Sequence, residues 1–257
     1  MRPKNRAALW EILPDLLRHS GIAALFRRIA LSASCLAVSS CDDLRFPRDP
    51  RQTLETVLAT EAVTVAAVDN PPWVAVDGEG GPEGAEVDLV EAFARELGVS
   101  IEWKRLAAFE ALEGLESGDL DLAIGGFERK AVTPVAGAAP SYAYFHEALV
   151  IGARPEVPFP EELDGQLVFV PSEEPIAELV RNEGGTPVGE WSAEVALAAV
   201  PHWQLASRGL LPTGIVLQRA EHVVAVPQGE NAWLMRIERF LRREYANMGE
   251  RLREHQP

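Results

Sequence analysis

The chain contains little cysteine and little positive charge for its length. Only two of its 257 residues are cysteines, Cys35 and Cys41, and both lie near the N-terminus. From residue 41 onward, 18 lysines and arginines stand against 37 aspartates and glutamates, a formal net charge of −19. Such an acidic body repels the phosphates of nucleic acids and of anionic lipid headgroups, so we expect neither as a partner.

Sequence motifs for catalysis and metal binding are also missing. The histidines show no spacing typical of metal ligands; they are His19, His146, His202, His222 and His255. The sequence has neither a G-x-S-x-G nucleophile turn nor a phosphate-binding loop ending in Lys-Ser or Lys-Thr. We therefore expect no catalytic residue, no metal and no cofactor.

The N-terminal region is predicted to direct export. Arg27 and Arg28 precede a short apolar run, residues 29–38, whereas a bilayer core requires about 20 apolar residues. The small residues just before Cys41 are typical of a lipoprotein cleavage site. We interpret residues 1–40 as an export signal and Cys41 as the lipid attachment site, which leaves no cysteine for a disulfide. A chance cysteine and an amphipathic membrane-surface helix are the alternative interpretations.

Patterns of strand and helix alternate after a polar segment. Residues 41–60 are predicted to be a tether, and residues 62–68 form a nearly unbroken run of small and β-branched residues, typical of a buried parallel strand. Two helices are predicted from apolar stripes that end at glycine caps; the stripes are Val87, Val90, Phe93 and Leu97 before Gly98, and Phe109, Leu112 and Leu115 before Gly118. With strands at 100–105 and 119–124, these units predict a parallel sheet with right-handed crossovers.

The loop after the first strand contains candidate ligand residues. Pro71 and Pro72 remove backbone donors and exclude helix, so Trp73 is expected on an extended loop beyond the carboxyl end of the strand. Open α/β sheets bind ligands there, and an aromatic ring can stack on a solute. A lid over the sheet edge is the alternative role for Trp73. Asp69 and Asn70 are expected to hydrogen-bond either the solute or the backbone of the turn.

Four segments, in their order and spacing, resemble a known family. They are DNPPW at Asp69–Trp73, GAEVDL at Gly84–Leu89, ARELGV at Ala94–Val99 and LESGDLDLAIGG at Leu115–Gly126. The chain thereby resembles the type 3 extracellular solute-binding proteins, which feed polar amino acids and related solutes to ABC importers. A fifth segment, His222–Leu241, resembles the strand and helix with which such chains return to their first lobe. The resemblance covers most of residues 61–248 and implies an α/β fold of the periplasmic-binding-protein type, with two lobes, parallel-rich sheets flanked by helices and a cleft between the lobes.

A segment with three prolines, residues 153–160, is the predicted boundary between the lobes. It places lobe 1 at residues 61–153 plus 220–250 and a small lobe 2 at residues 154–219. Two crossings between the lobes are typical of a hinge that closes on a ligand.

The resemblance also implies site residues. It places a carboxylate-binding arginine at Arg129, after Gly125, Gly126 and Phe127, which are candidate ligand residues as well. The two glycines are expected to expose backbone N–H groups to the cleft. In lobe 2, Ser172 is a candidate donor to an anion before a helix, with a plain helix cap as the alternative.

The sequence therefore predicts a periplasmic or extracytoplasmic solute-binding protein anchored by lipid. It would close its hinge on a small polar, amino-acid-like solute and deliver it to an ABC permease in the membrane. A sensory domain that reports the solute to a membrane partner, and a dehydratase-like enzyme on the same fold, are the alternatives.

Overall fold

The computed structural model describes residues 49–76, 80–171 and 174–256. The predicted export signal, Cys41 and Ser172 lie outside these ranges. Within them, no helix combines the length and the apolar character that crossing a membrane requires.

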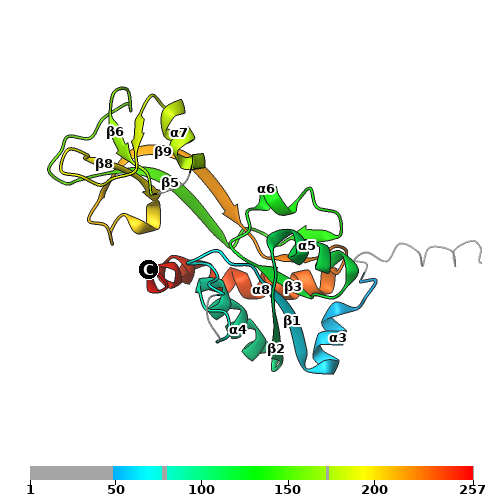
Figure 1. Ribbon diagram of the computed structural model, residues 1–257. Coiled ribbons are helices and arrows are strands. Elements are labelled where there is room, and N and C mark those ends of the chain that lie inside the picture. Colours follow the sequence, from blue (N-terminus) through cyan, green and yellow to red (C-terminus); the bar gives the residue numbers. More distant parts are fainter. Residues whose placement is uncertain (1–48, 77–79, 172–173, 257) are drawn as a thin grey trace, which may run out of the picture. The chain divides into compact units, whose positions relative to one another are not determined.

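The first sheet contains the two predicted strand-helix-strand units. Strand β1 (Ala62–Ala67) lies between β2 (Ser100–Arg105) and β3 (Leu122–Ile124) and is parallel to both. The full order is β2-β1-β3-β10-β4, in which β10 (Ala225–Pro227) pairs antiparallel with β3 and with β4 (Ala138–Pro140). The strand predicted to return late in the chain therefore fills the position beside β3, which confirms the predicted α/β class (Figure 1).

Helices cover both faces of this sheet. Val63 and Val65 of β1 belong to one buried cluster with residues of α4 (Ala85–Leu97), α8 (Asn231–Glu244) and α9 (Met248–Glu254). Ala66 belongs to a second cluster with α5 (Ala108–Ser117). Successive side chains of a strand point to opposite faces, so β1 supplies both clusters.

The predicted stripe of α5 is wrong at one residue. Leu112 and Leu115 are buried, together with Ala111, but Phe109 is 75% exposed. At 3.6 residues per turn, the inward direction set by these three residues lies more than a quarter turn away from Phe109. The predicted caps are present, since Gly98 and Gly118 both have left-handed backbone angles.

The predicted tether is wrong over residues 49–60. These residues include the helix α3 (Thr53–Thr60), in which Val57 is 1% exposed. The carboxylate of Glu230 accepts hydrogen bonds from the backbone N–H groups of Arg51 and Thr53, and Asp49 accepts one from Ala232 at the start of α8. The side chains before α3 and α8 thus cap each other's helix, which ties this segment to the folded body.

The second sheet has the order β7-β6-β8-β5-β9. Strand β6 (Leu167–Phe169) is parallel to β7 (Thr186–Val188) and β8 (Leu197–Pro201), with α7 (Glu174–Asn182) between β6 and β7 in the chain. The strands β5 (Phe145–Ala153) and β9 (Leu211–His222) run side by side and antiparallel (Figure 1).

The boundaries of the predicted lobes are therefore wrong at both ends of the second lobe. Residues 145–153 belong to the second sheet, because β5 pairs with β8 from Leu149 to Ala153 and with β9 from Phe145 onward. Similarly, β9 continues in this sheet as far as His222. The proline-rich segment follows β5 and is a loop beyond this strand rather than the point where the chain leaves the first lobe.

Candidate functional site

A buried carboxylate lies at the carboxyl end of β3. Glu86, in the first turn of α4, is 0% exposed. Its Oε2 atom accepts hydrogen bonds from the N–H groups of Gly125 and Gly126 at 2.7 Å each, and Tyr144 donates its hydroxyl to Oε1. The expectation that both glycines offer these N–H groups to a solute is therefore wrong, because a side chain of the protein already accepts them.

Burial changes the acidity of this pair. It raises the pKa of Glu86 above the ordinary range, although the hydrogen bonds from Tyr144, Gly126 and Gly125 act in the opposite direction. It also raises the pKa of the Tyr144 hydroxyl, and the neighbouring Glu86 carboxylate adds to that rise.

The loop after β1 closes onto the same turn. Asn70 donates its side-chain N–H to the carbonyl oxygen of Gly125 at 2.8 Å. Asp69 accepts a hydrogen bond from the backbone N–H of Val76 at 3.1 Å. In the structure both side chains therefore bind backbone, which was the alternative role expected from the sequence. Gly126 has φ 65°, and a Cβ atom there would lie 2.7 Å from the ring of Trp73, so this close approach requires glycine.

Trp73 is buried rather than displayed. Its side chain is 5% exposed and stacks on the ring of His222 at a centroid distance of 4.1 Å. The rings of Tyr144 and Phe145 approach it edge-on. The expectation of an extended loop is wrong because Asn70 and Val74 exchange two backbone hydrogen bonds, and these fold the segment between them into a turn.

Phe127 is also buried. It is 7% exposed and lies in the cluster beneath α5, with Val223 and Ala225. The structure thus brings Asn70, Trp73 and the two glycines together, whereas Phe127 packs into the core.

A second polar group connects this region to β5. His222 contacts the carbonyl oxygen of Gly126 through Nδ1 at 3.0 Å, and its Nε2 atom lies 3.6 Å from Glu147. Glu147 also accepts a hydrogen bond from the indole N–H of Trp203 at 2.8 Å. Burial acts to raise the pKa of Glu147, but the interactions with His222 and Trp203 outweigh burial and the pKa is lowered.

Sequence reasoning assigned no role to Glu86, Tyr144, Glu147 or His222. Glu86 lies within the GAEVDL segment and His222 begins the returning segment, so two of the four lay in stretches that the resemblance had marked. Glu147 and Tyr144 carried no such signal.

Arg129 lines a groove of about 580 Å³ at the start of α6 (Arg129–Val132). Its Nε atom lies 2.6 Å from Oε2 of Glu221, and the two side chains are 37% and 49% exposed. The groove is open and several charged residues lie along it; its lining residues are Glu128, Arg129, Lys130, Thr133, Pro134, Arg219, Ala220 and Glu221. Among the predicted site residues that the structure describes, Arg129 lines this cavity.

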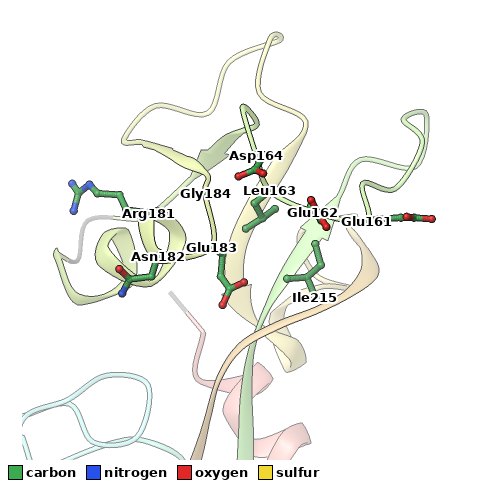
Figure 2. A pocket seen from close by; sticks show the side chains of 9 residues that line it. All are labelled: Glu161, Glu162, Leu163, Asp164, Arg181, Asn182, Glu183, Gly184 and Ile215. Atoms are coloured by element: carbon green, nitrogen blue, oxygen red, sulfur yellow. The ribbon is translucent and has the colours of Figure 1, made fainter.

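A second cavity, of about 450 Å³, lies within the second lobe. Glu161 and Arg181 extend to opposite sides of it, with Leu163 and Ile215 between them (Figure 2). Apart from Ile215 of β9, its residues precede β6 and β7. The cavity therefore lies at the amino ends of these parallel strands, opposite to the edge where open α/β sheets bind ligands. Within the described ranges, no three His, Cys, Asp or Glu side chains are placed to hold a metal ion.

Comparisons with known proteins give a consistent picture of the fold. Residues 63–250 match the bacterial extracellular solute-binding proteins, family 3. The L-cystine solute receptor of Neisseria gonorrhoeae, in its unliganded open conformation, has a TM-score of 0.60 at 16% identity, covering 76% of this chain and 92% of that one. No curated protein sequence matches significantly.

Two reconstructed ancestral proteins are similar as well. An ancestral cationic amino acid solute-binding protein has a TM-score of 0.59 at 16% identity over 77% of this chain and 98% of its own. An ancestral cyclohexadienyl dehydratase has a TM-score of 0.57 at 18% identity over 78% and 94%. At such identities the likeness shows the fold alone. Because the family match spans most of the residues that the structure describes, the chain belongs to family 3 of the bacterial extracellular solute-binding proteins.

Proposed function

We propose that this protein binds a small, polar, amino-acid-like solute outside the cytoplasm, closes about the hinge strands β5 and β9, and delivers the solute to an ABC permease. The observation that carries the proposal is the open groove at Arg129, which follows the carboxyl end of β3 and is lined on its other side by β9. A guanidinium group there can bind a solute carboxylate, and a groove against a strand that links the two sheets couples binding to hinge motion.

Family membership supports the class of solute. The named relatives of similar fold include receptors for L-cystine and for cationic amino acids. Asn70 and Trp73 are proposed to support the site rather than to touch the solute. Asn70 binds the carbonyl oxygen of Gly125 and Trp73 stacks on His222, and these contacts hold the turn after β3 in place. Ser172 keeps its proposed role as a donor from the second lobe.

A thermal-shift screen of the purified full-length chain tests the proposal. Amino acids, organic acids, polyamines and oligopeptides form the panel. A solute at 100 times its dissociation constant is expected to stabilise the protein by about 2.7 kcal/mol. A panel without any stabilising amino acid would contradict the proposal.

The role of Arg129 is tested by substitution. Arg129→Ala is expected to weaken the best solute at least about tenfold, since a hydrogen bond to a charged group contributes roughly 1.5–3 kcal/mol. Arg95→Ala is the matched control, because Arg95 also forms an exposed ion pair, with Glu91. Equal losses in the two variants would remove Arg129 from the site.

The proposed anchor is tested separately. Cys41→Ser is expected to abolish metabolic labelling with a radioactive fatty acid, whereas Cys35→Ser retains it. Labelling that depends on Cys35 instead would move the attachment site.

Binding without catalysis predicts that the solute is recovered chemically unchanged by mass spectrometry, and turnover would favour the enzyme alternative.

A further inference from the structure

The outer side of α8 is basic, although the chain as a whole is acidic. Four arginines lie within eight residues of this helix: Arg236, Arg239, Arg242 and Arg243. The buried residues of α8 gather on one side, and at 3.6 residues per turn Met235, Arg239 and Arg242 lie on the opposite side. All three are exposed, Met235 by 54%. We call these three residues the α8 face.

The two carboxylates of α8 are bound by other elements. Glu238 accepts a hydrogen bond from the backbone N–H of Tyr142 at 2.7 Å. Glu244 lies 2.9 Å from a guanidinium nitrogen of Arg251 in α9. Both carboxylates are half-buried in these contacts. Neither therefore neutralises the arginines of the α8 face.

One neighbouring acid, Glu96 of α4, is shared by two arginines. It pairs with Arg236 at 2.8 Å and also with Arg243. Within the described parts of the chain, Arg239 and Arg242 form no ion pair. The surface formed by α8 and Glu96 therefore carries an excess of positive charge.

The chain enters the folded body at the start of this helix. Asp49 accepts a hydrogen bond from the backbone N–H of Ala232, the second residue of α8, at 2.7 Å. Cys41 precedes Asp49 by eight residues, which span at most roughly 30 Å. A helix of this length extends about 21 Å. A lipid on Cys41 would therefore keep α8 within reach of the bilayer surface.

We propose that the α8 face lies on the surface of an anionic lipid bilayer, with Arg239 and Arg242 among the headgroups and Met235 at the boundary of the acyl chains. The inference rests on the proposed lipid anchor at Cys41. Clusters of about four or more basic residues on an amphipathic helix are typical of binding to anionic lipids. The α8 face thereby determines which side of the anchored protein is turned toward the membrane.

The distribution of charge modifies the expectation drawn from the net charge. The formal charge of −19 from residue 41 onward belongs to the whole body, whereas Arg239 and Arg242 lie together on one side of one helix. Charges act over about 10 Å at roughly 0.1 M ionic strength. The local charge of the α8 face therefore decides its attraction to anionic headgroups.

NMR of the protein purified from the membrane with its lipid attached tests this inference. It is placed in bilayer discs of phosphatidylcholine, with or without phosphatidylglycerol, that contain gadolinium-labelled headgroups. The signal observed is the methyl resonance of Met235, and Met248, which is 1% exposed, is the internal control. Broadening of the Met235 signal is expected to be at least about fivefold greater in the anionic discs. Added salt is expected to remove this difference.

Substitution of the two unpaired arginines completes the test. The double variant Arg239→Gln with Arg242→Gln is expected to lose the additional broadening in anionic discs. Lys104→Gln with Arg208→Gln is the matched control, because it removes two exposed positive charges from other elements and changes the net charge equally. The control is expected to behave as the wild type.

Three results overturn the inference. They are equal broadening of Met235 in neutral and anionic discs, equal losses in the two double variants, and a Met235 signal that shifts with protein concentration in neutral discs, which would assign the α8 face to a second copy of the chain. Absence of lipid on Cys41 would instead overturn the proposed anchor, and fatty acid labelling detects this separately.

Discussion

At the residue scale, Trp73 and Glu86 both lie inside the protein. Trp73 covers His222, and Glu86 holds the Gly125 and Gly126 turn, so both act on the rigidity of the site. Arg129 differs because its side chain is 37% exposed and lines a cavity. Trp73 and Glu86 therefore support the site from inside the protein, whereas Arg129 faces the groove.

The burial of Trp73 leads to a prediction about stability. Trp73→Ala removes a ring that is 5% exposed and in contact with three other rings, so we expect the free energy of unfolding to fall by about 3 kcal/mol or more. Urea denaturation provides the measurement. Trp191→Ala is the control, since Trp191 is 39% exposed, and a loss no larger than that of the control would contradict the prediction.

Glu86 predicts a dependence of stability on pH. Because burial raises its pKa above the ordinary 4.5, the folded protein binds this proton more tightly than the unfolded chain does. The contribution of this proton to stability is fully present below pH 4.5 and is lost as the pH rises through the raised pKa.

The variant Glu86→Gln has no proton to lose at this position. The free energy of unfolding of the wild type, minus that of the variant, is therefore expected to decrease as the pH rises from about 4 to about 8. Urea denaturation at several pH values measures this difference, and the exposed Glu55→Gln serves as the control. A difference that does not change with pH would show that Glu86 ionises as it does in the unfolded chain.

At the scale of elements, two helix starts are held by side chains from distant parts of the chain. The Glu230 carboxylate receives N–H groups at the start of α3, and Asp49 receives one at the start of α8. Glu230 is 1% exposed, so these hydrogen bonds are shielded from water. The N-terminal helix is thereby part of the body rather than a linker.

This reciprocal capping predicts a local effect. Glu230→Gln replaces one acceptor oxygen by an NH₂ group that faces a backbone donor, which is expected to cost about 1.5–3 kcal/mol. Hydrogen exchange should show the amides of α3 losing protection by at least about tenfold. Glu55→Gln, on the exposed face of α3, should leave protection unchanged. Protection that is equally retained in both variants would mean that packing of Val57 alone holds the helix.

At the scale of the whole molecule, the chain completes its first sheet only near its C-terminal end. Strand β10 lies between β3 and β4, and α8 then buries Trp233, Ile237 and Phe240. The second sheet is therefore inserted between two parts of the first. The chain enters the second sheet through β5 and leaves it through β9, and these two strands are the proposed hinge.

A truncated chain tests this dependence. A chain ending at Arg219 lacks β10 and α8, so we expect it not to fold, and its proton NMR spectrum to show little dispersion. A chain ending at Glu254 loses only the residues after α9 and is expected to give a well-dispersed spectrum. Good dispersion in the shorter chain would show that the first sheet does not need its returning strand.

The sequence by itself determined the parts that depend on neighbouring residues. The extent of β2, the glycine caps of α4 and α5, the parallel arrangement of the first three strands and the family all follow from local periodicity and short motifs. Only the tertiary structure decided which sheet β5 joins, because an apolar strand carries the same pattern in either lobe. The tertiary structure also decided which residues meet at the site. Contacts such as Glu86 with Gly126, and Arg129 with Glu221, join residues 40 and 92 positions apart. No local pattern encodes such a partner, since the energy of a buried or paired charge depends on what the fold places beside it.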